Sequence, residues 1–369
     1  MTSLSFLRYG VAAVLATAVM LLGACGGTDE GGAVPGATST ERFRWKMVTT
    51  WPPNLPVFSD SVEEFAEEVE TMSGGRLTID VFAGGELVPA LQVFDAVTRG
   101  IAEMGHGSGY YWAGKIPAAQ FLSTVPFGMS AAGMHAWLYA GGGLELWREI
   151  YEPFGVVPFP MGNTGYQMGG WFNRRIDSVA DLAELRMRIP GLGGKVFARA
   201  GGNPVLFSGG DLFVVLERGN IDAAEWVGPF HDTRLGLDQA AQYYYYPGWH
   251  EPGTELELIV NMKAWGKLPE DLKRIVEIAA AATDVKMLAR FDAANAKALE
   301  ALKAEGKVEI LPFPDDVLAE LEAMTRETLA AQAADDPTLA RVYERFRAFR
   351  ARDDAWRTIT EDALRRRPR

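Results

Sequence analysis

Between residues 43 and 105 the hydrophobic positions alternate between the two-residue period of a strand and the longer period of a helix. The helical period is clearest in Val57–Met72, because its apolar residues recur every three or four positions and its other face is acidic. The order strand, helix, strand, helix, strand predicts a parallel sheet with helices on its faces. The predicted strands are Phe43–Thr50, Arg76–Phe82 and Ile101–Gly105, and the predicted helices are Val57–Met72 and Ala90–Arg99.

A second α/β segment follows from about residue 155 to residue 226. Asp177 and Ser178, ahead of Val179–Leu182, predict a helix start. Gly191–Gly194 lacks the Rossmann spacing and a partner acid, so it predicts a loop. Thr254–Met262 alternates cleanly and predicts a strand. The other predicted strands are Val156–Met161, Met168–Phe172, Arg186–Ile189 and Ile221–Trp226.

From residue 269 onward the chain has three helical patterns, at Pro269–Ala304, Pro314–Ala334 and Leu339–Leu364. The last 29 residues contain ten arginines, and aromatic residues recur among them at roughly helical spacing. Two interpretations remain open for this end of the chain. It is either a solvated helix packed on the body of the protein or a helix that packs on a second subunit and forms a homodimer.

The first 27 residues have the pattern of an export signal. Arg8 is the only charge before residue 29, and the uncharged run Tyr9–Leu22 is too short to span a bilayer. The run ends in Leu-Gly-Ala-Cys, which resembles the lipobox of bacterial lipoproteins, and an ordinary signal with a fortuitous cysteine is the alternative. We expect a signal peptide over residues 1–24, a flexible tether over residues 25–41, and a periplasmic protein held to a membrane by a lipid on Cys25.

Composition excludes several classes of function. The 369 residues are 48% hydrophobic and 23% charged, as in a soluble globular protein, and their net charge of −12 argues against a nucleic-acid partner. A single cysteine excludes internal disulfides and cysteine-based zinc sites. The sequence has no Gly-x-Ser-x-Gly, Walker or His-Glu-x-x-His motif. The four histidines lie far apart, so each is interpreted as an ordinary polar residue.

Two residues are candidates for binding an anion. Arg188 lies in a short predicted strand whose alternation places it on the same side as Arg186. In a pocket its guanidinium would offer a planar fork to a carboxylate, whereas a surface arginine is the simpler interpretation of the bare sequence. Gln167 would supply an amide to the same pocket, and a turn or surface glutamine is equally consistent with the sequence.

Glu225 and Glu251 both border aromatic residues and turns. Two carboxylates in a pocket with an anionic ligand repel each other, and a hard cation with oxygen ligands removes that repulsion. Two alternatives remain: an acid/base pair for glycoside hydrolysis, or a pair of solvated acids. The aromatic clusters Tyr110–Trp112 and Tyr243–Tyr246 predict mostly core or lobe-packing residues, with a minority lining a binding cleft.

These stretches together resemble the extracytoplasmic solute-binding proteins of tripartite ATP-independent periplasmic (TRAP) transporters. The resemblance covers roughly Phe43 to Met324, and the order and spacing of its pieces make it specific. The pieces are the strand and helix of Phe43–Met72, the Gly-Gly-Arg-Leu-Thr-Ile segment at residues 74–79, Leu185–Gly191, Gly219–Trp226, the Tyr-rich stretch into Gly248–Gly253, and the long helix after Pro269.

The resemblance implies an α/β, two-lobed Venus-flytrap fold with long C-terminal helices and no catalysis. The lobes would close on a small organic acid anion and deliver it to the TRAP membrane permease subunits. The signature arginine of the family falls on Arg188. The Glu-Trp and Trp-x-Glu-Pro-Gly pieces look like the branch that binds 2-oxo or 2-hydroxy monocarboxylates with a Ca²⁺ or Na⁺ ion. The metal ligands of that branch would fall on Gln167, Glu225, the Trp226 carbonyl and Glu251.

The resemblance also places Gln167 and Trp226 among the residues that contact the ligand, and its weaker parts add Asn54, Tyr110 and Tyr111 to the cleft. It divides the chain into lobe I with its connecting helix (residues 42–164 and about 254–310), lobe II (165–253) and a C-terminal helical region (311–369). The alternatives for function are a receptor for a polyol or sugar acid, a secreted glycosidase that uses Glu225 and Glu251, and a sensory input protein that binds the same ligand but partners a signalling receptor.

Overall fold

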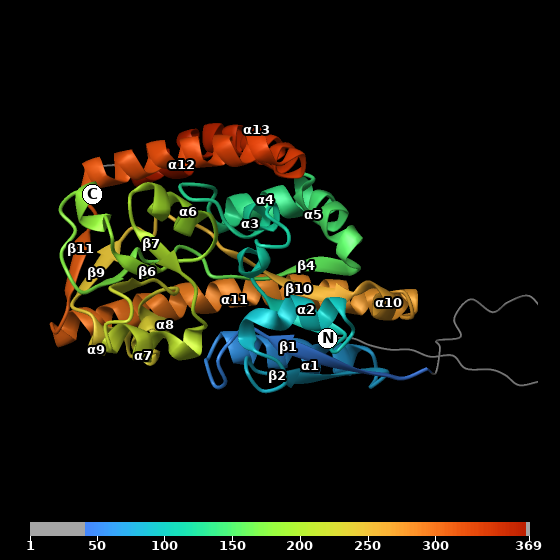
Figure 1. The fold of residues 1–369 in the computed structure, drawn as a ribbon. Coiled ribbons are helices and arrows are strands. Elements are labelled where there is room, and N and C mark those ends of the chain that lie inside the picture. The colour runs from blue at the N-terminus through green and yellow to red at the C-terminus, as the bar shows by residue number, and fades with distance from the viewer. Residues whose placement is uncertain (1–40, 367–369) are drawn as a thin grey trace, which may run out of the picture. The chain divides into compact units, whose positions relative to one another are not determined.

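Two mixed β-sheets form the frame of the protein (Figure 1). The structure is a computed structural model that describes residues 41–366. The predicted signal peptide, Cys25 and the tether up to residue 40 lie outside the described residues. Among residues 41–366, none of the helices has the length and apolarity needed to cross a membrane.

The first sheet has the strand order β2-β1-β3-β10-β4. The predicted parallel arrangement is confirmed for β1, β2 and β3 and is wrong for the sheet as a whole, because β10 runs antiparallel to both β3 and β4. The chain leaves this sheet at the end of the edge strand β4 and returns as β10, which lies between β3 and β4 and runs in the direction opposite to both. The strands are β1 Phe43–Thr49, β2 Leu77–Phe82, β3 Met104–Gly107, β4 Val156–Asn163 and β10 Glu255–Asn261.

The second sheet has the order β11-β9-β5-β8-β6-β7. Three of its strands are absent from the sequence prediction: β7 and β11 are short and contain proline, and β9 is the tyrosine run. The predicted strand Ile221–Trp226 shrinks to two residues, which leaves Glu225 just beyond its end. The strands are β5 Gly170–Phe172, β6 Arg186–Arg188, β7 Asn203–Val205, β8 Ala223–Ala224, β9 Tyr243–Tyr246 and β11 Glu309–Pro312.

Helices cover both sheets. In α1 (Phe58–Met72) the predicted apolar face is buried at Val62, Phe65 and Val69, whereas Met72 is exposed at the end of the helix. Gly191–Gly194 is not the predicted loop, because it forms the first turn of α6. The shorter helices are η1 Ala90–Gln92, α2 Val93–Thr98, η2 Gly109–Trp112, α3 Ala119–Ser123, α4 Ala131–Ala140, α5 Gly143–Tyr151, η3 Glu152–Phe154, η4 Val179–Leu182, α6 Gly191–Arg199, η5 Gly209–Asp211, α7 Leu212–Glu217, α8 Pro229–Arg234, α9 Leu237–Ala240 and α10 Met262–Trp265.

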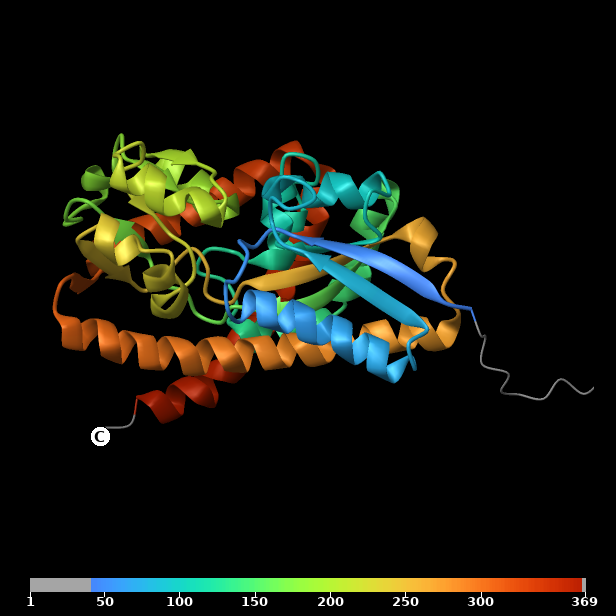
Figure 2. The same ribbon diagram turned by 90° about the horizontal axis from the view of Figure 1, so that it is seen from below.

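Long helices connect the two sheets. The helix α11 (Glu270–Glu305) packs on the strand β4 of the first sheet and on the neighbouring helix α1 (Figure 2). It also packs on the helix α8, which lies on the side of the second sheet. On another side, α12 (Asp315–Asp335) packs on α6, and α13 (Pro337–Ile359) packs on α3, α4 and α5. The chain crosses between the sheets after β4 and before β10, near the predicted lobe boundaries at residues 164 and 254. Those boundaries stay predictions, and β11 places Leu311 and Pro312 of the predicted helical region in a strand.

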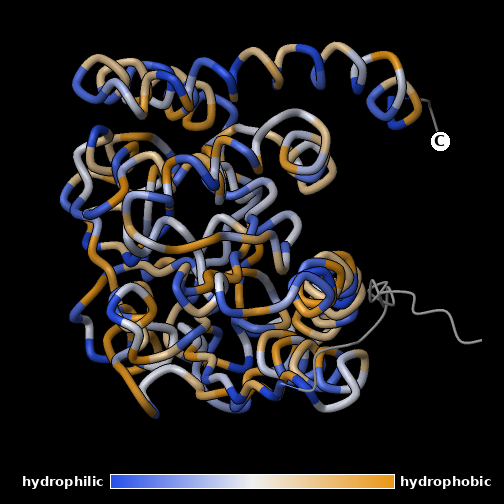
Figure 3. The backbone as a smooth tube through the Cα atoms, turned by 90° about the vertical axis from the view of Figure 1, so that its right-hand side faces the viewer, coloured by the Kyte–Doolittle hydropathy of each residue, from blue (hydrophilic) through white to orange (hydrophobic). Residues whose placement is uncertain are grey.

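The C-terminal helices have a buried side and an exposed end. Leu339, Val342 and Phe346 of α13 are buried, so this part of the arginine-rich segment packs on the body of the protein as one interpretation predicted. Hydrophilic and hydrophobic residues alternate along α12 and α13 in Figure 3. Trp356 and Ile359, near the end of α13, and Leu364 of α14 (Glu361–Arg365) are exposed. The second interpretation, packing on another subunit, stays a prediction.

One buried acid of the first sheet makes the stability of the folded protein depend on pH. Glu257 of β10 is 0% exposed and accepts hydrogen bonds from the Tyr151 hydroxyl at 3.0 and 2.9 Å on its two oxygens. Trp112 Nε1 in turn donates to the Tyr151 hydroxyl at 2.9 Å. Burial raises the pKa of Glu257 from 4.5 to about 8. Between these values the folded protein holds a proton that the unfolded chain has released, so this group lowers stability as pH rises.

We therefore expect Glu257→Gln to flatten the pH dependence of unfolding. Glutamine keeps an acceptor for Tyr151 and never ionises, so between pH 5.5 and 8.5 the variant should lose on the order of 1–3 kcal/mol less stability than the wild type. Urea unfolding at the two pH values measures this difference. The matched control is Glu320→Gln on the exposed side of α12. Parallel pH curves for Glu257→Gln and the wild type would contradict the assignment.

Candidate functional site

The ends of two parallel strands bring Arg188 and Glu225 together. In the register of β6 and β8, Arg188 pairs with Ala224, and the Glu225 amide donates to the Arg188 carbonyl at 3.1 Å. Arg188 Nη1 forms an ion pair with Glu225 Oε1 and also donates to the Glu225 carbonyl at 3.0 Å. Both side chains are only 1% exposed. The carboxyl ends of parallel strands in an α/β sheet are a common place for a binding site.

The remaining nitrogens of Arg188 are held as well. Its Nε donates to the Phe207 carbonyl at 3.3 Å, and its Nη2 donates to the Tyr111 hydroxyl at 3.2 Å. The guanidinium lies 5.0 Å from the centre of the Trp226 ring. Arg188 is therefore a fixed, buried cation, and the interpretation of a surface arginine is wrong. Arg186 is exposed at the start of the same strand and pairs with Asp222 at 3.3 Å.

Glu251 and Gln167 come from the two loops that cross between the sheets. Gln167 Nε2 donates to Glu251 Oε2 at 2.7 Å, and the Thr254 hydroxyl donates to the same oxygen at 2.6 Å. The loops are tied by their backbones, since Gln167 N donates to the Glu251 carbonyl at 3.3 Å and Gly248 N donates to the Gln167 carbonyl at 3.0 Å. A Cβ on residue 248 would lie 2.3 Å from the Gln167 oxygen, so the close approach of the loops requires glycine there.

His250 joins the two glutamates. Its Nε2 lies 3.3 Å from Glu225 Oε2, and one ligand atom from each of Glu225, His250 and Glu251 lies within 4.8 Å of the others. Burial, and then the charge of Glu225, raise the pKa of Glu251 to about 7. The Gln167 Oε1 atom is buried and has no hydrogen-bond partner. Two buried carboxylates beside an unpaired amide oxygen fit a hard cation, because such ions take oxygen ligands.

Aromatic side chains from the first sheet close the site. Tyr110 and Tyr111 lie on η2, just after β3, with their rings 4.8 Å apart and perpendicular. Burial, and then the charge of Glu251, raise the pKa of Tyr110 above its ordinary value. The Trp226 ring packs edge-on against Trp51 and Phe58, each at 6.4 Å. Residues of both sheets therefore surround the Arg188 guanidinium.

Asp232 anchors the segment that carries Glu225 and Trp226. Its Oδ1 accepts from the amides of Val227 at 3.2 Å and Gly228 at 3.0 Å. Its Oδ2 accepts from Trp171 Nε1 at 3.0 Å and from the Tyr244 hydroxyl at 2.7 Å. The chain just after Trp226 is thus fixed by a buried carboxylate.

The structure brings most of the predicted residues together. Arg188, Glu225, Tyr111 and His250 form one hydrogen-bonded or ion-paired set, on which Tyr110 and Trp226 pack. Gln167 and Glu251 form a second hydrogen-bonded pair, and Glu251 lies within 4.8 Å of Glu225 and His250. Asn54 does not join the set through any contact seen among residues 41–366. It is exposed and lines a separate cavity with Thr49, Trp51 and Glu63.

Three groups of the site have no place in the sequence prediction. His250 is predicted as an ordinary polar residue but lies beside Glu225, and its position directly before Glu251 is the one signal that points to it. Asp232 and the Phe207 carbonyl had no signal in the sequence. In the tyrosine run, Tyr244 and Tyr245 are buried in β9, which agrees with the expectation of core residues.

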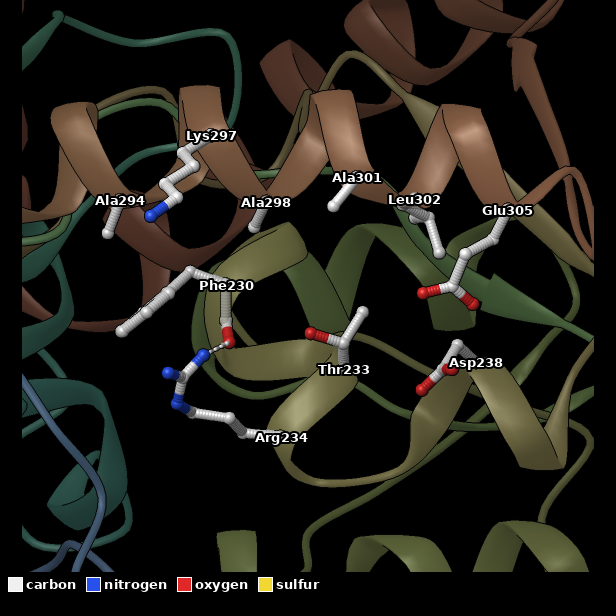
Figure 4. Close-up of a pocket in the computed structure, with 10 residues that line it drawn as sticks. All are labelled: Phe230, Thr233, Arg234, Asp238, Ala294, Lys297, Ala298, Ala301, Leu302 and Glu305. Carbon is white, nitrogen blue, oxygen red and sulfur yellow. Dashed lines mark hydrogen bonds between the residues drawn. The ribbon is translucent and has the colours of Figure 1, made fainter.

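A different cavity lies between α11 and the helices α8 and α9 (Figure 4). It has a volume of about 360 Å³ and is lined by apolar, acidic and basic side chains, among them Arg234, Lys297 and Glu305. Arg234 stacks on Phe230 at 3.8 Å and donates to its carbonyl at 3.2 Å. None of the residues predicted to bind a ligand lines this cavity.

Comparison with known proteins finds a family and relatives that resemble this chain. Residues 47–336 match the family described as bacterial extracellular solute-binding protein, family 7 (DctP). The chain is 44% identical over 349 residues to the monocarboxylate 2-oxoacid-binding periplasmic protein of Nostoc sp. strain PCC 7120, with 95% of this chain and 94% of that protein covered.

Two solved structures are similar in fold and sequence. The TRAP periplasmic solute-binding protein of Colwellia psychrerythraea, described with bound calcium and pyruvate, is 43% identical, with a TM-score of 0.85 and coverage of 88% of this chain and 99% of that one. The corresponding protein of Pseudoalteromonas atlantica, described with bound sodium and pyruvate, is 41% identical, with a TM-score of 0.87 and coverage of 89% and 100%. The two-lobed fold expected from the sequence is confirmed by these matches. With most of its length matched by the family and by a relative 44% identical, the chain belongs to bacterial extracellular solute-binding protein family 7, the DctP family of TRAP transporter receptors.

Proposed function

We propose that this protein is the extracytoplasmic receptor of a TRAP transporter and binds a small 2-oxo or 2-hydroxy monocarboxylate, such as pyruvate or lactate, together with Ca²⁺ or Na⁺. The observation that carries the proposal is the buried Arg188 beside two buried glutamates and an unpaired amide oxygen. The names of the similar proteins, which include a 2-oxoacid-binding protein and two pyruvate complexes, support this ligand class. The receptor would deliver its ligand to the membrane permease subunits.

Charge balance explains why a cation belongs in this site. Arg188 supplies one positive charge, Glu225 and Glu251 supply two negative charges, and a monocarboxylate adds a third. Without a metal the buried set carries a net charge of −2, which is costly in a low-dielectric interior. Ca²⁺ brings the total to zero and Na⁺ brings it to −1. A cation therefore turns a site that repels anions into one that accepts them.

In this proposal the ligand carboxylate pairs with the guanidinium of Arg188. Gln167 through its Oε1, Glu225, the Trp226 carbonyl and Glu251 would hold the cation, which would supply positive charge near the ligand when it is bound. Glu225 would then divide its carboxylate between the metal and Arg188.

The aromatic residues orient the ligand and exclude water from it. The Tyr111 hydroxyl contacts Arg188 and would share the ligand carboxylate, while Tyr110 and Trp226 would form walls of the site. Gln167 would contact the ligand from the loop that it shares with the cation site. Asn54 is proposed as a weaker contact that would have to reach the ligand from its exposed position beside Trp51.

The alternatives have less support. A polyol or sugar-acid receptor would use the same fold and aromatic residues, but two adjacent buried glutamates suit a cation better than a neutral polyol. The secreted glycosidase is set aside, because the family consists of solute-binding proteins rather than enzymes. A sensory input protein would use the same site, and only its partner would differ.

We also propose that a lipid on Cys25 holds the receptor to a membrane on the periplasmic side. The support is the lipobox-like sequence Leu-Gly-Ala-Cys and the tether that follows it. A homodimer through the exposed ends of α13 and α14 is proposed on the exposure of Trp356, Ile359 and Leu364, and sedimentation velocity of the soluble domain would test it.

For the anchor we expect Cys25→Ser to release the protein from the membrane fraction. Labelling of growing cells with a radioactive fatty acid should mark the wild type and not the variant. Export without labelling of the wild type would mean that Cys25 is only part of an ordinary signal peptide.

For the arginine we expect Arg188→Gln to weaken pyruvate binding by about 10- to 150-fold, because a charge-assisted hydrogen bond contributes roughly 1.5–3 kcal/mol. Isothermal titration calorimetry of the soluble domain with Ca²⁺ present measures the affinity. The matched control is Arg186→Gln, two residues away on the same strand but exposed, which should bind as the wild type does. Thermal unfolding without ligand checks that the variant folds. Equal affinities for Arg188→Gln and the wild type would remove the assigned role.

For the cation we expect pyruvate to raise the melting temperature by several degrees only when Ca²⁺ or Na⁺ is present. Glu251→Gln should abolish most of this shift, because it removes a metal ligand and a charge. The matched control is Glu257→Gln, a buried glutamate outside the site, which should retain the shift. A pyruvate shift that persists in chelator and sodium-free buffer would contradict the metal assignment. A shift with mannitol alone would favour the polyol alternative.

A further inference from the structure

A second cluster of potential metal ligands lies outside the Arg188 site and has no part in the proposed function. It consists of His135 on α4, Glu255 at the start of β10 and Asp284 on α11. One ligand atom from each residue lies within 4.8 Å of the others. The side chains of Glu255 and Asp284 are 0% exposed and that of His135 is 19% exposed. Side chains from three separate elements therefore meet at a place that is buried except on the side of His135.

The distances in this cluster are compatible with a bound metal ion. His135 Nε2 lies 3.2 Å from Asp284 Oδ1 and 3.5 Å from Glu255 Oε2. A strong bond from a charged N–H to a carboxylate is about 2.7–2.9 Å long, and one N–H can point at only one of the two oxygens. Two ligand atoms on a tetrahedral ion with bonds of about 2.0–2.2 Å lie roughly 3.3–3.6 Å apart. An ion could enter with little movement of the backbone.

Glu255 supplies an independent indication. Its Oε2 accepts from Asn163 Nδ2 at 2.9 Å, while its Oε1 is buried and has no hydrogen-bond partner. The residue as a whole is 1% exposed. A buried carboxylate oxygen without a partner is unfavourable, because its desolvation is not compensated. The oxygen nearest to His135 is Oε2, so a cation would supply the missing partner if it were held through Oε1 while Oε2 stayed with Asn163.

Charge is compatible with such an ion. With both carboxylates ionised and His135 protonated, the cluster would carry a net charge of −1 in a buried place, and a proton on Glu255 would remove that charge. A divalent ion with a neutral imidazole and two carboxylates brings the total to zero. Such neutral sets are the ones that a protein interior accommodates most easily.

We propose that His135, Glu255 and Asp284 form a binding site for a divalent metal ion of the zinc class. A histidine nitrogen with carboxylate oxygens suits Zn²⁺ and related transition-metal ions, whereas Ca²⁺ and Na⁺ take oxygen ligands. The Tyr139 hydroxyl donates to Asp284 Oδ2 at 2.9 Å and orients that carboxylate. Three protein ligands leave a position for water, and the partly exposed His135 and Tyr139 lie on the route to solvent.

An ion at this site would stiffen the crossing between the sheets. Asn163 and Glu255 are opposite each other where the chain leaves and re-enters the first sheet, and α11 packs along the same region. The ion would link α4 and α11 to the start of β10. Its effect on solute binding would be indirect, through the positions of the loops that carry Gln167 and Glu251.

The test uses the soluble full domain with Zn²⁺ and Co²⁺ as probes. Calorimetry with Zn²⁺, in the presence of saturating pyruvate and Ca²⁺ to occupy the Glu225–Glu251 site, should show one ion per chain. Co²⁺ should give the visible absorption of a four-coordinate ion. His135→Gln and Asp284→Asn should each weaken Zn²⁺ binding more than tenfold, because each removes one of three ligands.

The controls distinguish this site from others. His231→Gln removes a buried histidine elsewhere and should bind Zn²⁺ as the wild type does. Circular dichroism and pyruvate affinity show whether each variant is folded. Zn²⁺ binding that survives in both ligand variants, or that is lost in Glu251→Gln instead, overturns the proposal. An absence of Zn²⁺ and Co²⁺ binding by the wild type also overturns it and leaves the cluster as an ion-paired network.

Discussion

Buried charge at the junction of the two sheets is the constraint on which the rest of this structure depends. Arg188 and Glu225 are each 1% exposed, and a buried ion is tolerated only when it is paired and hydrogen-bonded. The parallel register of β6 and β8 provides the pairing, and the Phe207 carbonyl and Tyr111 hydroxyl saturate the guanidinium. An anionic ligand and its cation enter an environment in which the charges are already positioned.

The same requirement explains the acids around the crossing between the sheets. Asp232, Glu251 and Glu257 are each buried and hydrogen-bonded by partners both near and far in sequence. Asp232 accepts from the amides of the nearby Val227 and Gly228, from Tyr244 and from the distant Trp171. Glu251 accepts from the nearby Thr254 and the distant Gln167, and Glu257 accepts from the distant Tyr151. Glu255 differs because one of its oxygens has no partner. In this region the hydrogen-bonding of carboxylates, more than apolar packing alone, fixes where the loops lie.

Much of the framework was predictable from local patterns. The spacing of Val62, Phe65 and Val69 predicted α1, and the prolines at 269 and 314 marked the starts of α11 and α12, because these signals act within a few residues. The third helical pattern, predicted from Leu339, begins two residues earlier at Pro337, where the Asp336 side chain accepts from two amides of the first turn. The antiparallel β10 and the short strands β7, β9 and β11 were missed, because pairing with distant strands rather than local period creates them.

The sequence by itself determined the class of the fold, the family and the residue types available for binding, because motif order and hydrophobic period are properties of the chain. Only the tertiary structure decided that Arg188 is buried rather than exposed, that His250 stands beside Glu225, that Asp232 holds the segment after Trp226 and that Asn54 lies apart from the set. The tertiary structure also brought His135, Glu255 and Asp284 together from three elements. The physical reason is that desolvation and hydrogen-bond pairing depend on neighbours far away in the chain, 149 positions in the case of His135 and Asp284, and no local pattern records them.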